Sequence, residues 1–285
     1  MRENIMKKLL LLSLILISST ILLAVFDDYQ PSARARAMGG AFTGVANDIN
    51  SIFFNPAGIA DTGYEAKIGF ANLNGEAFSE YKTLAAGAKL PKYFGTIGLA
   101  LRMLDVDFEG HTLSSEQIYT LSHGITLQKD IHSTINFGYS VNYYNLAFDD
   151  DDSDAAIGFD LGVSAVLHTR TKLGFAVTNL SKAKMGFENQ IDLPSKLALG
   201  ISYLPYDRVT TTIEVKKDFA CETEFMGGVE ARLFDPLAIR FGVHQNPASY
   251  SAGATFHLEG VSLDYAFTMH SVLAPTHYLN LGYKY

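Results

Sequence analysis

The sequence of 285 residues contains no tryptophan and only one cysteine, Cys221. Because a lone thiol cannot form an internal disulfide, the stability of the fold must come from other interactions. The formal net charge is −8 and there is no basic tail or stripe, which argues against nucleic acid as a partner. No spacing of cysteine and histidine fits a zinc site, so we predict neither a metal nor a cofactor.

Long apolar runs are also lacking after residue 26, where none approaches the 18 residues of a membrane helix. This does not exclude a membrane, because barrel strands carry their apolar face within an alternating pattern that averaged hydropathy misses. No linker or composition break divides the chain after the N-terminal region. We therefore predict one domain over residues 63–285.

The first 24 residues are predicted to be a signal peptide. Arg2, Lys7 and Lys8 form its positive end, and an apolar stretch runs from Leu9 to Val25. Ala24 is the best cleavage candidate, and an uncleaved helical anchor is the alternative. No cysteine follows the apolar stretch, which excludes a lipoprotein anchor there.

Residues 63–285 divide into about fourteen short runs in which bulky apolar residues alternate with small or polar ones. Side chains alternate between the two faces of a strand, so each run has one face of bulky apolar residues and one face of small or polar residues. The period of the alternation alone does not say which face points outward. A soluble barrel would place the bulky side chains inside. The export signal and the lack of packing helices favour the membrane interpretation. Three apolar sets are Ile97, Leu99, Leu101 and Met103; Ile135, Phe137, Tyr139, Val141 and Tyr143; and Leu279, Leu281, Tyr283 and Tyr285.

The connections between these runs alternate in length, which is an independent signal. Short turns are predicted near residues 91–92, 129–130, 169–170, 205–206, 234–236 and 259–260, and longer ones at residues 109–115, 148–154, 181–193, 220–224 and 271–276, among others. Outer-membrane barrels have short periplasmic turns and longer external loops. We therefore predict an all-β fold: a transmembrane, antiparallel, up-and-down β-barrel of about fourteen strands, whose last strand pairs with its first.

Several strands carry charged residues on the face of small and polar residues. We expect this face to line a water-filled lumen. Glu214, Lys216, Glu230, Arg232 and Arg240 are expected to form cross-strand ion pairs, or alternatively to tune the passage of polar solutes. The predicted polar residues of the lumen are Arg102, Asp160, Glu214, Glu230, Arg232, Arg240 and Asp264.

Residues 25–62 do not alternate and are rich in alanine and glycine. A barrel of about fourteen strands is too wide for its own side chains to fill, so this segment is predicted to be a short plug, or hatch, in or under the lumen. Arg34 and Arg36 could pair with inward acids and hold it, or could be solvated. Residues 149–152 with Asp154 could chelate calcium or form a solvated loop.

The hatch segment carries a motif that resembles the N-terminal signature of the FadL-like outer-membrane superfamily, and is most similar to its PorV/PorQ-type branch. The motif reads Ala-Arg-Ala-Met-Gly-Gly-Ala-Phe over residues 35–42, then Ala-Asn-Asp at 46–48 and Phe-Asn-Pro-Ala-Gly at 54–58. The chain departs from the pattern at Asn47, where an acid is commoner. The motif residues are Arg36, Gly39, Gly40, Asp48, Asn55, Pro56, Ala57 and Gly58.

The resemblance implies a fourteen-stranded barrel with an N-terminal hatch and two possible functions. One is passive transport of small hydrophobic, fatty-acid-like molecules, gated by the hatch. The other is a non-conducting scaffold that docks a secretion or surface-protein partner, as in type IX secretion. The expected partners are therefore outer-membrane lipid, and either hydrophobic small molecules or such a protein. No Gly-x-Ser-x-Gly or His-Glu-x-x-His motif is present, so we predict that the protein is not an enzyme.

Overall fold

The computed structural model describes residues 26, 29, 31–76, 78–108, 111–148, 153–186, 190–219, 221–270 and 273–285. The predicted signal peptide, residues 1–24, and the acidic run at residues 149–152 lie outside the described residues. No helix among the described residues is both long enough and apolar enough to cross a membrane.

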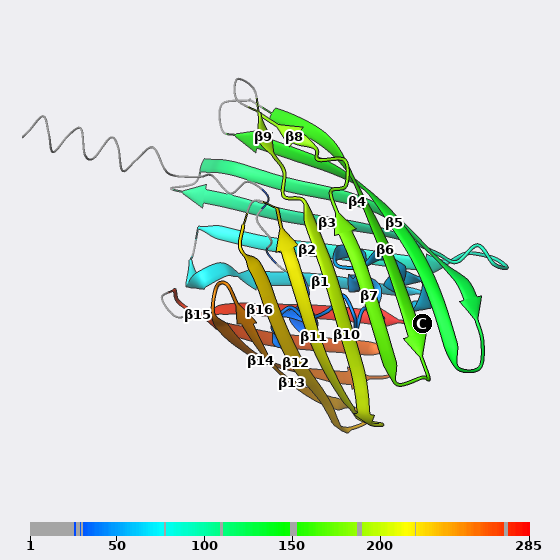
Figure 1. The fold of residues 1–285 in the computed structure, drawn as a ribbon. Helices are drawn as coiled ribbons and strands as arrows, with labels where there is room; N and C mark the ends of the chain where they lie inside the picture. Colours follow the sequence, from blue (N-terminus) through cyan, green and yellow to red (C-terminus); the bar gives the residue numbers. More distant parts are fainter. Residues whose placement is uncertain are drawn as a thin grey trace, which may run out of the picture.

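The chain forms a closed barrel of fourteen antiparallel strands, as the alternation predicts (Figure 1). Each strand pairs with its neighbours in sequence, and the last strand pairs with the first from Glu65 opposite Lys284 to Asn72 opposite His277. A separate two-residue ribbon, β8 (Lys184–Met185) with β9 (Ile191–Asp192), lies in the connection between β7 and β10. The barrel strands are β1 (Glu65–Asn72), β2 (Ser79–Lys89), β3 (Thr96–Phe108), β4 (His111–Lys129), β5 (Ser133–Phe148), β6 (Ser153–Leu167), β7 (Thr171–Thr178), β10 (Lys196–Tyr206), β11 (Val209–Asp218), β12 (Thr223–Phe234), β13 (Leu237–Gln245), β14 (Ser249–Leu258), β15 (Val261–His270) and β16 (Thr276–Lys284).

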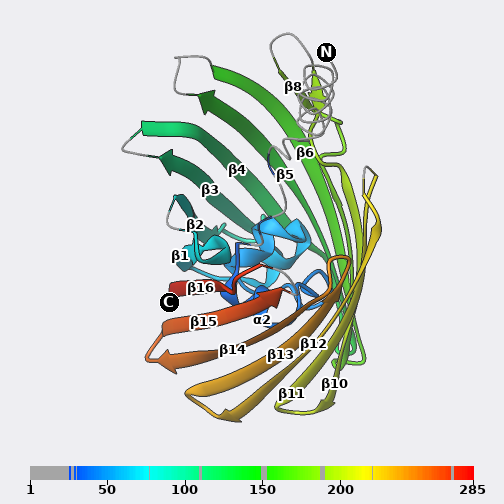
Figure 2. The same cartoon turned by 90° about the vertical axis from the view of Figure 1, so that its left-hand side faces the viewer.

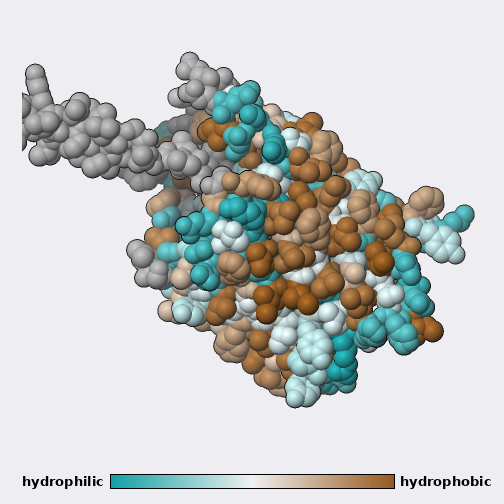
Figure 3. All heavy atoms as spheres, in the orientation of Figure 1, coloured by the Kyte–Doolittle hydropathy of each residue, from teal (hydrophilic) through white to brown (hydrophobic). Residues whose placement is uncertain are grey.

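The bulky apolar side chains point outward and the polar ones inward, as expected for the membrane interpretation. Leu99 is 62% exposed on the outer wall, whereas Asn136 and Asn142 of the inner wall are fully buried. On the face drawn in Figure 3, apolar side chains gather across the middle of the wall and hydrophilic ones toward its ends. This inside-out arrangement is what distinguishes the wall from that of a soluble barrel.

The strands differ in length, and this corrects one predicted loop. The longest are β3 to β6, with 13, 19, 16 and 15 residues. Residues 109–115 were expected to form a longer loop, but β4 begins at His111. The Thr112 hydroxyl donates to the Asp107 carboxylate at 2.6 Å and that of Ser115 donates to Asp105 at 2.7 Å. These cross-strand bonds satisfy the polar side chains while the two strands continue to pair.

The hatch segment lies inside the barrel, where it folds into three short turns of helix (Figure 2). These are α2 (Ala33–Ala37), η1 (Ile49–Phe53) and η2 (Pro56–Asp61), while a fourth, η3 (Leu73–Gly75), follows β1. Between residues 31 and 60 only Asn47 is exposed, so the segment is packed like a protein core.

Inward-facing glycines let the hatch approach the wall at backbone distance. We call them the glycine belt, because many are cross-strand partners, such as Gly138 with Gly162 and Gly228 with Gly242. A Cβ added at Gly138 would lie 2.3 Å from the carbonyl carbon of Pro56, and one at Gly242 would lie 1.9 Å from the nitrogen of Gly39. No side chain fits there. The belt comprises Gly87, Gly98, Gly124, Gly138, Gly162, Gly174, Gly200, Gly228, Gly242 and Gly253.

We expect Gly138→Val to destabilise the folded barrel by about 1–3 kcal/mol, because an overpacked side chain forces the hatch or the wall to move. The measurement is urea unfolding in detergent micelles, followed by circular dichroism. Gly227→Val is the matched control, since its Cβ would meet no atom nearer than 3.7 Å. Equal unfolding midpoints for the two variants would contradict the belt as a packing requirement.

Candidate functional site

The hatch holds its shape through local caps, which short helices need because most of their backbone groups have no partner within the helix. The Ser32 hydroxyl accepts from the nitrogen of Ala35, the Asp48 carboxylate from that of Asn50, and the Asn55 side chain from that of Ala57. Pro56 occupies the first turn of η2, where its missing N–H costs nothing. The motif therefore encodes a string of capped turns.

The two motif glycines after α2 have a steric role. Gly39 and Gly40 have positive φ values of 67° and 90°, which favour glycine. Gly39 also lies against the backbone of Val243 in β13. Together they turn the chain sharply while it touches the wall. Ala57 and Pro56 contact the belt at Gly138, and Gly58 packs against Ser51 and Ala46 within the hatch.

A buried group of charges, which we call the latch, joins the hatch to the wall: Arg34, Asp48, Glu230 and Arg240. The Arg34 guanidinium donates from Nε and Nη2 to the two carboxylate oxygens of Glu230, at 2.9 and 3.0 Å. Its Nη1 contacts Asp48 Oδ2 at 3.0 Å. Arg240 Nε lies 2.5 Å from Glu230 Oε2, from the next strand. Two-point pairing of this kind fixes orientation as well as position.

The surroundings of the latch keep its hatch groups charged. Burial opposes ionisation of Asp48, but Lys67 and Arg34 beside it lower its pKa to about 2. Burial likewise opposes the charged form of Arg34, yet Glu230 and Asp48 raise its pKa above the ordinary value. The Lys67 ammonium lies 3.1 Å from Asp48 and 3.7 Å from Asp264. The two hatch members of the latch, Arg34 and Asp48, are therefore charged at neutral pH.

The structure separates the predicted lumen residues into several groups. Glu230 and Arg240 belong to the latch, and Asp264 adjoins it, because the Thr255 hydroxyl that contacts Asp264 also accepts from Arg240. Asp160 lies on β6, where it accepts from Asn142 at 2.7 Å and from the nitrogen of Asn179 at 2.8 Å. Both of these hydrogen-bond donors are neutral, and neither belongs to the latch.

Two of the five residues expected to form cross-strand ion pairs, Glu214 and Arg232, do not form them. Glu214 faces Gly200 on one side and Met226 on the other, so no opposite charge is available to it across the sheet. It instead accepts from the nitrogen and hydroxyl of Thr43 in the hatch, at 2.7 and 2.8 Å. Arg232 faces Ala238 on β13 and lies exposed at one end of the lumen. The other three residues of that group do form cross-strand pairs, Glu230 with Arg240 and Lys216 with Glu224.

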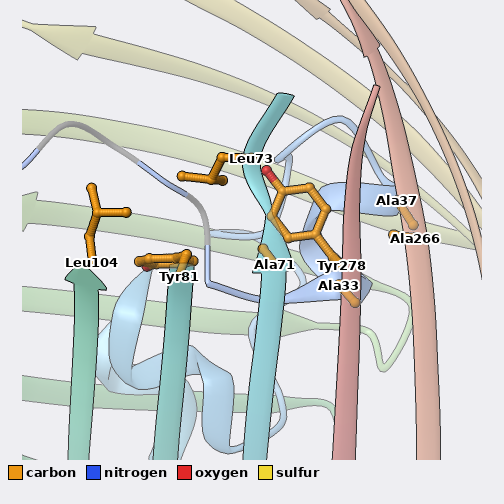
Figure 4. Packing of buried hydrophobic residues seen from close by; sticks show 8 residues of the cluster. All are labelled: Ala33, Ala37, Ala71, Leu73, Tyr81, Leu104, Ala266 and Tyr278. Carbon is orange, nitrogen blue, oxygen red and sulfur yellow. The ribbon is translucent and has the colours of Figure 1, made fainter. Parts of the chain in front are cut away.

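Arg34 and Arg36, two residues apart on α2, have different environments. Arg34 enters the latch, whereas Arg36 donates to the Thr268 hydroxyl at 3.1 Å and lies over the ring of Tyr278. Figure 4 shows Tyr278 beside Ala33 and Ala71 in the cluster that joins α2 to the neighbouring strands.

Other wall residues that hold the hatch were not predicted. Lys172 donates to the carbonyl of Ala46 at 2.5 Å, and the Asn280 side chain accepts from the nitrogen of Ala33 at 2.5 Å. Asn280 lies between Leu279 and Leu281, so the alternation itself marks it as an inward polar residue. Lys67 lies in a weakly patterned strand, where no comparable signal was present.

The hatch divides the lumen into two parts, and both contain charged residues. Toward the end with longer connections, inward-facing residues of β4 and β5 form an apolar cluster with Phe26 and the loop around β8 and β9: Phe26, Ile118, Tyr144, Leu146, Ala183, Met185 and Leu193. A cavity of about 60 Å³ remains between this cluster, Phe53, Phe54 and Arg102, and its lining also includes Lys196, Glu214 and Lys216. Toward the short turns, two charged cavities of about 370 and 310 Å³ border the hatch.

No protein-family model matches this sequence, and no curated protein matches it. Among solved structures, the fold is similar to the toluene transporter TodX of Pseudomonas putida, with a TM-score of 0.61, 9% identity, and coverage of 88% of this chain and 97% of that one. It is also similar to a FadL homologue of Pseudomonas aeruginosa, with a TM-score of 0.58, 11% identity, and coverage of 89% and 98%. At such identities the similarity concerns the fold alone. It agrees with the FadL-like barrel expected from the motif, while the PorV/PorQ-type branch stays a prediction.

Proposed function

We propose that this chain is an integral outer-membrane barrel for the passive movement of small hydrophobic molecules, with the hatch as its gate. An apolar outer wall, an even number of strands and short turns at one end are the features of outer-membrane barrels. The described structural relatives include a toluene transporter and a FadL homologue, which is consistent with this location and role.

The observation that carries the proposal is the apolar patch that β4 and β5 present to the lumen on the long-connection side of the hatch. The interior of a water-conducting barrel is polar. Here Ile118, Tyr144 and Leu146 point into the lumen and are covered by Phe26, whose ring meets that of Tyr144 edge-on at 5.3 Å. A surface of this kind favours a hydrophobic guest over a hydrated one. The remaining 60 Å³ is too small for such a guest, so Phe26 would have to yield its place.

Arg102 indicates that the guest carries an acidic group. Its Nε is buried and has no hydrogen-bond partner among the described residues, and its guanidinium lies 5.5 Å from the centre of the Phe53 ring. A buried donor without an acceptor is costly, so a ligand that supplies one gains affinity. A carboxylate beside an apolar chain, as in a fatty acid, matches this cation at the edge of an apolar cluster.

The hatch blocks the lumen, so passage requires some of it to move. The glycine belt sets its position and the latch sets its orientation. Because both hold the hatch from several strands, opening would require the hatch to give up some of these contacts.

A docking scaffold is the alternative, and the closed lumen favours it. Such a protein would need the barrel as a rigid support and would conduct nothing. Uptake measurements separate the two functions.

We expect liposomes containing the full-length barrel to take up a labelled long-chain fatty acid faster than empty liposomes. Arg102→Leu should slow this uptake about tenfold, since the loss of one charge-assisted hydrogen bond has that effect on affinity. Uptake of the uncharged methyl ester should be unaffected by the substitution. Arg232→Gln, at the far side of the hatch, is the control for a general change in charge. Uptake no faster than that of empty liposomes would reject transport and leave the scaffold.

We expect Arg34→Met to weaken docking of the hatch by ~3 kcal/mol, because it leaves Glu230 and Asp48 buried with one cation fewer. Hydrogen–deuterium exchange of residues 31–62 should become roughly a hundredfold faster. Arg36→Met removes an arginine from the same helix without breaking an ion pair, and should change exchange little. If both variants exchange alike, the latch is not what holds the hatch.

A further inference from the structure

The connection between β7 and β10 folds over the apolar patch that β4 and β5 present to the lumen. Its described residues, 179–186 and 190–195, form what we call the lid. The ribbon of β8 and β9 belongs to it, and Figure 1 shows this ribbon at the end of the barrel with the longer connections. Three apolar side chains of the lid are buried in the cluster around Phe26: Ala183, Met185 and Leu193.

The lid has an apolar side toward the patch and a polar side away from it. Met185 is buried, whereas its neighbour Lys184 is exposed and pairs with Asp192 at 3.0 Å across the ribbon. A single two-stranded ribbon is at best marginally stable in water. The lid therefore keeps its place through its contacts with the barrel.

The side chain of Asn179 fastens the two limbs of the lid to each other. It is fully buried, its Oδ1 accepts from the nitrogen of Ala183 at 2.9 Å, and its Nδ2 donates to the carbonyl of Leu193 at 3.0 Å. The backbone nitrogen of Asn179 donates to the Asp160 carboxylate of β6 at 2.8 Å. We call Asn179 the clasp, because it joins both limbs of the lid to the wall.

The wall is shaped to receive the clasp. Asp160 accepts from Asn142 of β5 at 2.7 Å, and Asn142 accepts from Thr120 of β4 at 2.7 Å, so buried hydrogen bonds run from three strands to the lid. Gly158, a buried glycine of β6 outside the glycine belt, lies beside the clasp. A Cβ added there would lie 3.1 Å from Asn179 Oδ1, so even a methyl group would crowd it.

The two limbs of the lid are held differently. The first limb is bonded directly to β6, where the nitrogen of Leu180 donates to the carbonyl of Phe159 at 2.7 Å and that of Gly186 donates to the Asp154 carboxylate at 2.6 Å. The second limb, residues 190–195, is joined to the first through the clasp and the ribbon. Pro194 of this limb lines the cavity beside Phe26 and Arg102. Lifting the second limb therefore opens that cavity toward the long-connection side.

We propose that the second limb of the lid opens to admit the hydrophobic molecule to the apolar patch, and that the clasp controls this opening. The inference rests on the proposed function and adds the route of entry, which is from the long-connection side. The lid and Phe26 cover the same patch, so a molecule that arrives from this side has to displace both. Asn179 is a positioning residue, because it acts through the lid and does not touch the molecule.

The test of the clasp is the rate at which a thiol beneath the lid is labelled. Leu193→Cys places a buried reporter in the second limb, and Cys221→Ser removes the natural thiol of the chain. A water-soluble maleimide is added to the folded, full-length protein in nonionic detergent. We expect Asn179→Gly to speed labelling about tenfold or more, because it removes the side-chain hydrogen bonds. Gly158→Ala, which crowds the clasp from the wall, should speed it as well.

Lys182→Gly is the matched control. Lys182 lies in the same limb, and its φ of 53° is close to the 51° of Asn179, so glycine is tolerated equally well at both positions. Its exposed side chain makes no hydrogen bond or ion pair with the described residues, so labelling should be unchanged. Each variant is first shown to keep the circular dichroism spectrum of the reporter protein. Equal labelling rates in the Asn179 and Lys182 variants would overturn the proposal.

A second arm measures entry, with the labelled fatty acid and liposomes that contain each variant without the reporter substitutions. Asn179→Gly should take up the fatty acid faster than Lys182→Gly. Faster labelling with equal uptake would overturn the lid as the route of entry. Uptake no faster than that of empty liposomes in every protein, including the unsubstituted one, would instead reject the proposed function. The labelling rates require no fatty acid and decide separately whether the clasp holds the lid.

Discussion

Closure of the sheet is the constraint on which the rest of the structure depends. Backbone groups left unpaired in hydrocarbon are too costly to tolerate, so β1 must pair with β16, and the two strands are joined along the whole of β1. A closed sheet of fourteen strands encloses more space than its own side chains fill. The hatch fills that space. The inner wall carries glycines, which have no side chain, where the hatch packs against it. The small inward residues of the wall are therefore complementary to the hatch and not simply a sign of a water-filled lumen.

The alternation along the chain was sufficient to predict the number of strands, their direction and the face that each presents. These are local properties, because period and turn length are encoded within a few neighbouring residues. Closure followed from a physical argument about unpaired backbone groups. The prediction that residues 25–62 plug the barrel, in or under its lumen, followed from the width of the barrel together with the composition of the segment.

The contacts between hatch and wall could not be predicted, because they join residues far apart in sequence. Glu214 illustrates the point: its place on the inner face was predictable, but its partner, Thr43, is 171 residues away. Cross-strand neighbours depend on register, and register placed Gly200 and Met226 beside it in place of a cation. Arg232 was misassigned for the same reason. The extension of β4 to His111 was missed because polar residues that pair with each other across two strands look like a loop when each strand is considered alone.

The contacts of the hatch with the wall also differ in stiffness, and this bears on how a gate could open. At Gly138, Gly174 and Gly242 the wall meets the backbone of the hatch, which cannot yield without a shift of the whole segment. At Gly87 and Gly98 it meets only the terminal methyl groups of Ile49 and Ile52, which can rotate away. The compliant part of the hatch is therefore η1, next to β2 and β3. Phe53, at the end of η1, is also the ring that Arg102 covers. A guest held at Arg102 would thus press on the part of the hatch that is least rigidly packed, so that binding and opening would be linked by contact and would not require the latch to break.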